Sequence, residues 1–184
     1  ISNIDQLKLK IPLDSIKYYQ IEVEDIWGLK KGSNIIIGDF EHEIWGNIYS
    51  VLNTTTLNLS SKNLSGIIPI SIGYLKNLSH LALNANYLNG KIPSEIGELK
   101  NLVFLDLSNN NELTGSIPPE IGTLKNLTQL YINNTLISGS IPTSIFYLPN
   151  LTNLGLSNNK LSGYIPYEIG ELEKIKYLNL WNNN

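Results

Sequence analysis

The chain has 184 residues, a formal net charge of −3 and an isoelectric point near 5.4. A basic face for phosphate groups is not expected from this balance, which argues against a nucleic-acid partner. No apolar run reaches the length of a membrane span, so no membrane contact is expected from this piece. The absence of cysteine excludes a disulfide framework and a cysteine zinc site. The sequence begins with Ile and contains no Met, and we expect it to be part of a longer product.

Residues 1–52 form an irregular segment without an internal period. Short apolar runs at 21–23, 35–37 and 44–45 are separated by glycines and predict short strands and turns. We expect this cap-like segment to cover the apolar end of the structure that follows, with Trp27 and Trp45 contributing to the cover. The alternative is that the two tryptophans stack on a sugar.

From residue 53 to residue 184 one sequence unit recurs about five and a half times. Its central leucines are spaced by 24, 24, 25, 24 and 24 residues: Leu57, Leu81, Leu105, Leu130, Leu154 and Leu178. In the copy that starts at Leu78, the pattern L-x-x-L-x-L predicts a short strand whose leucines point inward. Asn86 follows, and its amide is expected to bond unpaired backbone groups in a ladder from copy to copy. A single unit cannot bury its own apolar residues, so the copies must stack.

Three local features vary among the copies. Lys62 and Thr135 occupy the position of the ladder Asn, and Phe146 stands where the other copies have Gly. One extra residue in SNNNELTGSIP predicts a small bulge at that corner.

The recurring prolines fix φ and donate no hydrogen bond, which favours an irregular outer wall without paired strands.

The motif L-x-x-L-x-L-x-x-N-x-L-x-G-x-I-P-x-x-I-G-x-L resembles the plant-specific class of leucine-rich repeats, which occurs in receptor-like kinase ectodomains and polygalacturonase-inhibiting proteins. The resemblance covers residues 52–184, and the segment around Trp45-Gly46 is similar in layout to the N-terminal cap of that family, although the cap cysteines are missing. It implies an α/β fold, a right-handed leucine-rich repeat solenoid with a concave parallel β-sheet. It also implies a non-catalytic binding role. We expect the C-terminal end of the solenoid to be truncated.

The inventory of reactive side chains does not favour an enzyme, and no catalytic residue, metal site or cofactor is predicted. There are two histidines and no cysteine, and the glycine-containing turns lack the lysine of a phosphate loop. His80 and Asp106 are predicted to face outward on adjacent strands at a diagonal of roughly 7 to 8 Å, too far for a direct hydrogen bond. No nucleophile is evidently paired with them. A third metal ligand is not evident either.

The outward positions of the predicted strands carry the candidate partner-binding residues. Aromatic residues at these positions have no core to fill, so we expect them to be exposed, and aromatic residues are typical of binding hot spots. The candidates are His80, Phe104, Asp106, Gln129, Tyr131, Tyr177 and Trp181. For Tyr177 and Trp181 the alternative is that a later repeat or cap covers them.

Seven Asn-x-Ser/Thr sequons are present, and three of them share one repeat position. These three, Asn77, Asn126 and Asn150, are the glycosylation candidates, and they favour an extracellular or cell-surface location. Three functions stay open: an extracellular module that binds a protein or peptide on its concave face, a structural or adhesive surface protein, and a glycan-binding module. The sequence leaves the oligomeric state open.

Overall fold

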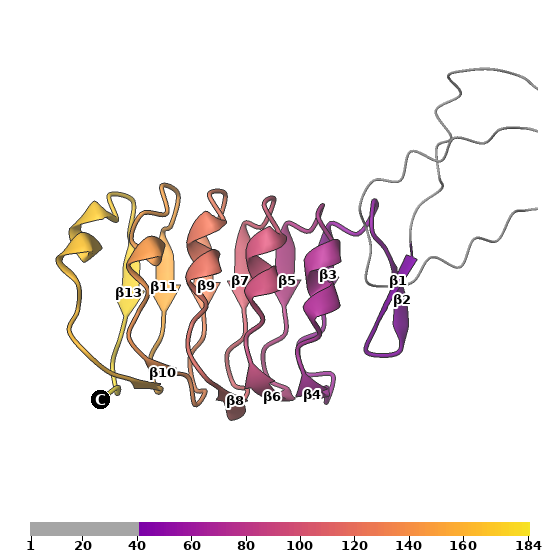
Figure 1. The fold of residues 1–184 in the computed structure, drawn as a ribbon, viewed down its shortest axis with the longest axis horizontal. Coiled ribbons are helices and arrows are strands. Elements are labelled where there is room, and N and C mark those ends of the chain that lie inside the picture. Colours follow the sequence, from indigo (N-terminus) through magenta and orange to yellow (C-terminus); the bar gives the residue numbers. More distant parts are fainter. Residues whose placement is uncertain (1–40) are drawn as a thin grey trace, which may run out of the picture. The chain divides into compact units, whose positions relative to one another are not determined.

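Six short parallel strands lie side by side in the computed structural model, which describes residues 41–184 (Figure 1). The strands are β3 (Thr56–Asn58), β5 (His80–Ala82), β7 (Phe104–Asp106), β9 (Gln129–Tyr131), β11 (Asn153–Gly155) and β13 (Tyr177–Asn179). Their register pairs Leu57 with Leu81, Leu81 with Leu105, and so on through the sheet. Each residue therefore lies beside its equivalent one period away, which confirms the predicted parallel repeat sheet.

The predicted inward residues form one continuous core between the walls of the coil. In the copy that starts at Leu78, the three strand leucines are fully buried, as are Ile96 and Leu99 on the return path. The equivalents in the neighbouring copies belong to the same core. Burying these aliphatic side chains supplies the main stabilisation, and it depends on a neighbouring coil on each side.

A second ladder of strands was not predicted. β4 (Ser65–Ile67), β6 (Tyr87–Lys91) and β8 (Glu112–Thr114) form a parallel three-stranded sheet, and β10 (Ser138–Gly139) pairs with β12 (Lys160–Leu161). The expectation of a wall without paired strands was therefore wrong. The strands β4, β6 and β8 end before Pro69, Pro93 and Pro118, so no proline is required to donate in the ladder. The extra residue of the third copy lies in the turn before β8.

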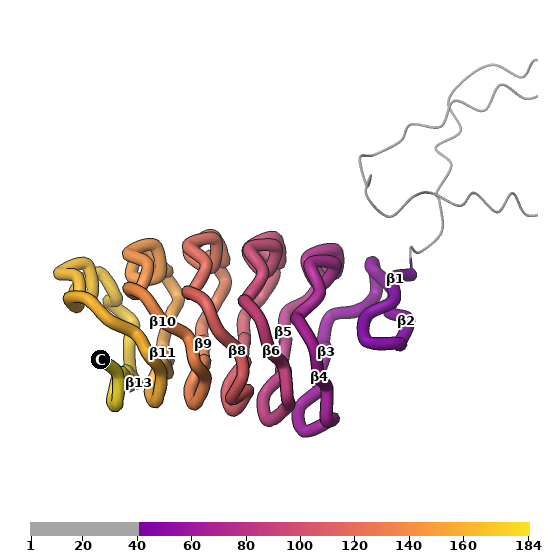
Figure 2. Tube along the Cα trace, turned by 60° about the horizontal axis from the view of Figure 1, so that its bottom comes forward, coloured from indigo at the N-terminus to yellow at the C-terminus, as the bar shows by residue number. Residues whose placement is uncertain are grey.

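Five short 3-10 helices complete the coils, and the tube in Figure 2 shows the successive coils stacked along one direction. They are η1 (Ile70–Tyr74), η2 (Ser94–Glu98), η3 (Pro119–Thr123), η4 (Thr143–Ile145) and η5 (Tyr167–Glu171). A proline precedes each helix with extended φ and ψ angles, so its fixed φ sets the direction in which the helix starts. Within residues 41–184 no helix is long and apolar enough to cross a bilayer.

Phe146 changes the geometry of its coil. η4 has three residues where the other helices have five, and Phe146 follows it in the αR conformation with a fully buried side chain. At the equivalent Gly97, an added Cβ would lie 2.6 Å from the Cβ of Glu120 in the next coil. The Phe146 ring is part of the core, at a position where the other coils have no side chain.

The predicted Asn ladder is present. Asn86 accepts from the N–H groups of Lys62 and Leu64 through Oδ1 and donates through Nδ2 to the carbonyls of Leu59 and Leu83. Asn110 makes equivalent bonds in the next coil. Each ladder Asn therefore satisfies backbone groups of its own coil and of the preceding one.

A β-hairpin of β1 (Glu41–Ile44) and β2 (Asn47–Ser50) precedes the first coil. Ile44 is buried in the repeat core, and Trp45 packs against that core. Trp45 lies in the turn, not in a strand as its apolar run predicted, because Trp45 and Gly46 have φ values of 47° and 73°. Two consecutive positive φ angles match a two-residue hairpin turn. Trp27 and the runs at 21–23 and 35–37 lie outside the described residues, and the boundary at residue 52 stays a prediction.

Candidate binding face

Three aromatic side chains on adjacent strands contact one another on the outward side of the six-stranded sheet. His80 on β5 stacks on Phe104 on β7, with ring centroids 6.1 Å apart and an interplanar angle of 20°. Phe104 meets Tyr131 on β9 at 6.1 Å and a tilt of 57°. We call these three residues the aromatic row. The parallel register pairs Phe104 directly with His80, whereas Tyr131 pairs with Asp106 and its ring meets Phe104 diagonally.

Tyr131 is held on three sides. Its hydroxyl donates to Oε1 of Gln129 at 3.3 Å, and Phe104 lies against one side of the ring. On the other side is Gly155, where an added Cβ would lie 2.8 Å from Cδ1 of Tyr131. The missing side chain at Gly155 therefore provides the space that the tyrosine ring occupies. Phe104 and Tyr131 are half-buried, not fully exposed as predicted, because they pack on their neighbours.

Asp106 lies beside Tyr131 in the sheet register, two residues after Phe104 on the same strand. Its Oδ1 accepts a hydrogen bond of 2.9 Å from the N–H of Ser108. Across residues 41–184 the one ion pair is Lys76–Glu98, so Asp106 has no cationic side chain beside it in this part of the chain. The carboxylate is half-buried and borders the aromatic row.

Polar side chains that were not predicted as site residues fix the edge of the face. Asn133 donates through Nδ2 to Oγ of Ser108 on one side, and its Oδ1 accepts from the hydroxyl of Ser157 on the other. Ser60 and Asn84 are bonded in the same way. The sequence contains a signal for these residues, because they occupy the same outward position in successive repeats. Their hydrogen-bond partners, however, lie 24 or 25 residues away in the sequence.

Tyr177 and Trp181 belong to a second, separate group on the last coil. Their exposed fractions are 44% and 72%, which confirms that they are exposed. The Nδ2 of Asn179 donates to the Tyr177 hydroxyl, and its Oδ1 accepts from the Trp181 N–H. β11 separates these residues from Tyr131. The structure therefore brings five of the seven predicted residues together and leaves two apart.

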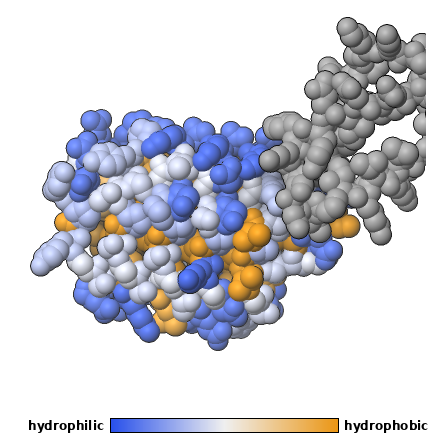
Figure 3. Space-filling model, viewed as in Figure 1, coloured by the Kyte–Doolittle hydropathy of each residue, from blue (hydrophilic) through white to orange (hydrophobic). Residues whose placement is uncertain are grey.

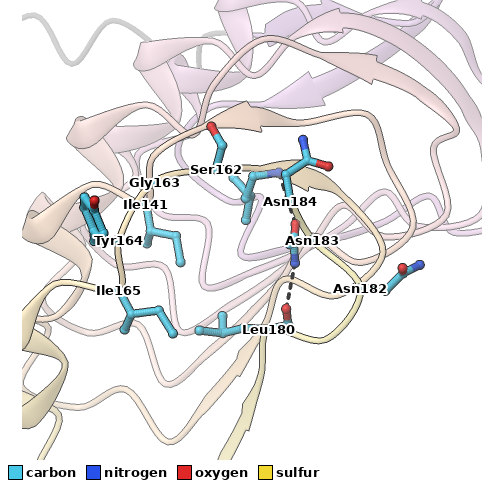
Figure 4. Close-up of a pocket in the computed structure, with 10 residues that line it drawn as sticks. Ile141, Ser162, Gly163, Tyr164, Ile165, Leu180, Asn182, Asn183 and Asn184 are labelled. Carbon is cyan, nitrogen blue, oxygen red and sulfur yellow. Dashed lines mark hydrogen bonds between the residues drawn. The ribbon is translucent and has the colours of Figure 1, made fainter.

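A cavity of about 240 Å³ opens beside the last coil. Figure 4 shows Ile141, Ile165 and Leu180 around it, with Asn183 donating to the carbonyl of Leu180. In the earlier coils, core residues of the next copy pack against the equivalent side chains. The cavity is therefore present because the last coil has a neighbouring coil on one side only.

The arrangement around His80 gives no support for a catalytic pair with Asp106. The Nδ1 of His80 lies 2.8 Å from the hydroxyl of Ser79, which also bonds to the carbonyl of Thr55. A hydroxyl is thus paired with His80, contrary to the sequence prediction. Because the serine has one hydrogen and the Thr55 carbonyl can only accept, both contacts are satisfied when Nδ1 carries the imidazole proton. Among residues 41–184 no group of three His, Cys, Asp or Glu side chains could hold a metal ion.

The three glycosylation candidates also have a structural role. Asn77, Asn126 and Asn150 each donate through Nδ2 to a carbonyl of the preceding coil, at 2.7, 2.9 and 3.0 Å. Asn101 makes the same bond, and Leu102-Val103 after it gives no sequon. A hydrogen bond between coils therefore explains why Asn recurs at this position, whether or not a glycan is attached.

Comparison with known proteins places the chain in a family. A model described as "Leucine rich repeat" matches residues 53–112 and 116–184, and a second, "Leucine Rich Repeat", matches residues 101–124. The first model alone covers more than half of the chain. The chain therefore belongs to the leucine-rich repeat family. A comparison with curated protein sequences gives no match.

Solved structures similar to the chain are plant receptor ectodomains. A chain of the PEPR1–AtPEP1 complex is 43% identical with a TM-score of 0.68, over 70% of this chain and 18% of that one. A chain of the Arabidopsis HAESA complex with the peptide hormone IDA and the co-receptor SERK1 is 39% identical with a TM-score of 0.67, over 70% of this chain and 22% of that one.

A chain of the BIR3–SERK2 complex from Arabidopsis thaliana is 38% identical with a TM-score of 0.62, and the match covers 78% of this chain and 71% of that one. The resemblance to plant receptor-like kinase ectodomains is confirmed by these structures. The similarity to polygalacturonase-inhibiting proteins stays a prediction. This chain spans about a fifth of the PEPR1 and HAESA chains.

Proposed function

We propose that this leucine-rich repeat protein is a non-catalytic extracellular recognition module whose concave face binds a protein or peptide, as part of a receptor-like ectodomain. The observation that carries the proposal is the aromatic row. Its residues lie outside the core, and the fold does not need aromatic side chains at those positions. Phe104 and Tyr131 are nevertheless held in place by neighbours on both sides. Preorganised aromatic groups rimmed by polar side chains are typical of the centre of an interface.

The similar structures support this proposal. Two of them are complexes, one with AtPEP1 and the other with the peptide hormone IDA and the co-receptor SERK1. A peptide that lies across parallel strands of the second to fourth coils would meet the aromatic row together with Asp106 and Gln129. Tyr177 and Trp181 lie further along the same sheet and would extend the contact toward the last coil.

The test is a binding measurement with peptides selected from a random display library on the full 184-residue chain. Phe104→Ala and Tyr131→Ala should each weaken binding by about 1 to 2 kcal/mol, roughly five- to thirtyfold, without loss of the fold. Tyr87→Ala is the matched control, because Tyr87 is 64% exposed but lies on β6.

Selected peptides whose affinity is unchanged by the Phe104→Ala and Tyr131→Ala double variant would contradict the concave-face proposal. Preferential binding to glycans on an array would favour a glycan-binding module. The absence of any ligand would favour a structural or adhesive role.

The extracellular location has a separate test. Asn77 and Asn126 are exposed at the loop that precedes their strands, away from the outward face. A glycosylated asparagine keeps one N–H, so the bond to the preceding coil can persist beside a glycan. Protein secreted from eukaryotic cells should therefore carry glycans at Asn77, Asn126 and Asn150, measured by intact mass before and after enzymatic removal. The absence of a glycan from all three asparagines would count against the extracellular assignment.

A further inference from the structure

The concave face carries one fixed charge. Each repeat contributes two outward positions on its strand and a third two residues after the strand, and among these eighteen positions Asp106 is the only acidic residue, while no lysine or arginine occurs there. The rest are aromatic, small or neutral polar residues. A ligand that lies on this face therefore meets a single negative charge near its middle, on β7.

The carboxylate of Asp106 retains capacity to bind a cation. In the described residues it accepts one hydrogen bond, from the Ser108 N–H to Oδ1, and forms no ion pair. A carboxylate has about four acceptor positions on its two oxygens. Because Asp106 is half-buried among aromatic and neutral side chains, its charge is screened less than that of a fully exposed group.

Two aromatic residues flank Asp106 on the outward face of the sheet. Tyr131 is its neighbour in the sheet register, and Phe104 is on the same face of its own strand. A carboxylate together with aromatic rings suits a guanidinium group, which is planar, stacks on rings and pairs with a carboxylate through two parallel N–H donors. An ammonium group is compact and more strongly hydrated, so it gains less from the rings.

From these observations we infer that the ligand of the concave face presents an arginine side chain, whose guanidinium pairs with Asp106 and stacks on the Phe104 and Tyr131 rings. The inference rests on the proposed function and names the chemistry of its ligand. Asp106 and the aromatic row together form the arginine site.

The first test repeats the display selection on three forms of the full chain. Asp106→Asn removes the charge but keeps an oxygen for the Ser108 N–H. Glu112→Gln makes the same change in charge on β8 and serves as the matched control. We expect arginine to be enriched at one peptide position with the wild type and with Glu112→Gln, and not with Asp106→Asn. A peptide selected on the wild type should bind about three- to tenfold more weakly to Asp106→Asn, with the difference reduced at high salt.

The second test uses N-acetyl-arginine amide as a small probe. In NMR titrations it should shift the ring resonances of Phe104 and Tyr131 in the wild type, with a much smaller effect in Asp106→Asn. N-acetyl-glutamine amide should have little effect on either protein, because it has no charge to pair with Asp106.

The outcomes separate the two proposals. Peptides that depend on Phe104 and Tyr131 but show no preference for arginine, or bind Asp106→Asn equally well, would overturn the arginine site and leave the concave-face proposal standing. Arginine enrichment that also disappears in Glu112→Gln would point to general charge attraction and would overturn the arginine site as well. Peptides that ignore the aromatic row would overturn both.

Discussion

Strands β7 and β13 have the same repeat pattern but different surroundings. Leu105 on β7 is fully buried, while its equivalent Leu178 on β13 is 40% exposed. β7 pairs with β5 on one side and β9 on the other, whereas β13 pairs with β11 alone. The difference shows that the motif alone does not bury a leucine, because part of its packing comes from the next coil. The contribution of each leucine to the free energy of unfolding therefore depends on the position of its coil in the stack.

The largest expected effect comes from cutting a leucine in the middle of the stack. Leu105→Ala should lower the free energy of unfolding by about 2 to 5 kcal/mol, because it leaves a cavity between packed coils. Leu178→Ala should cost less than about 2 kcal/mol, since its side chain is already partly in water. Urea denaturation monitored by circular dichroism measures both. Equal losses for the two variants would contradict the dependence on stacking.

A matched change on the other face of β7 sharpens this test. Asp106→Ala changes a residue directly after Leu105 whose side chain points outward and accepts one hydrogen bond from the Ser108 N–H, so it should cost about 1 kcal/mol or less. A loss comparable to that of Leu105→Ala would contradict the assignment of the two faces.

The two sets of asparagines offer the next comparison. Asn110 is fully buried and bonds the Leu88 N–H and the carbonyls of Leu83 and Leu107. Asn110→Ala should cost about 2 to 4 kcal/mol because it leaves several buried backbone groups without partners. Asn101→Ala removes one bond at the exposed surface and should cost about 1 kcal/mol or less. Thermal unfolding would rank them, and similar costs would show that burial does not decide the value of these bonds.

A third comparison concerns glycines at one repeat position. At Gly122 an added Cβ would lie 2.4 Å from the Cβ of Ser144 in the next coil, whereas nothing lies within 4 Å at Gly170. Gly122→Ala should therefore cost about 1 to 3 kcal/mol through overpacking. Gly170→Ala should be neutral or stabilising by a few tenths of a kcal/mol, because alanine restricts the unfolded chain. Calorimetric melting of both variants would decide, and a stabilising Gly122→Ala would show that the coils can move apart.

The repeat fold could be predicted from the sequence because each structural feature is written several times. The spacing of the leucines fixes the parallel register, and the recurring Asn marks the ladder. The second sheet was missed for a physical reason. β4, β6 and β8 include Gly66, Gly90 and other residues that carry no alternating apolar pattern, and each pairs with a strand one coil away. Such pairing depends on the coil path, which the local sequence does not show.

The candidate site was predictable in its positions but not in its contacts. Outward alternation placed Phe104 and Tyr131 on one face, and the register confirmed their proximity. The role of Gly155 was missed because it depends on the conformation of a side chain one coil earlier. The same is true of the Ser79 hydroxyl beside His80, because the sequence does not show the rotamers that bring the two side chains together.

The smallest expected effect is a pH dependence at the hairpin, where the packing differs from that of the repeats. His42 on β1 is buried at 8% exposure, and its ring meets Tyr74 of η1 edge-on at 5.1 Å. Desolvation lowers the pKa of His42 from its ordinary value of 6.5, and the charge of Glu43 partly opposes this shift. Below pH 6.5, the folded protein therefore binds fewer protons than the unfolded chain. The contribution of neutral His42 to the free energy of unfolding is therefore fully present above pH 6.5. It is lost as the pH falls through the lower pKa of His42 in the folded state.

An NMR titration of the two histidines, His42 and His80, measures this directly. We expect the His42 ring to titrate below 6.5 and the hairpin amides to exchange faster with solvent as the pH falls, after correction for the intrinsic exchange rate. His42→Phe keeps an aromatic ring against Tyr74 and should abolish the pH dependence, while His80→Gln should leave it unchanged. A His42 pKa at or above 6.5 would show that the imidazolium is as well accommodated as the neutral ring. Neutral His42 would then contribute nothing to the stability of the hairpin.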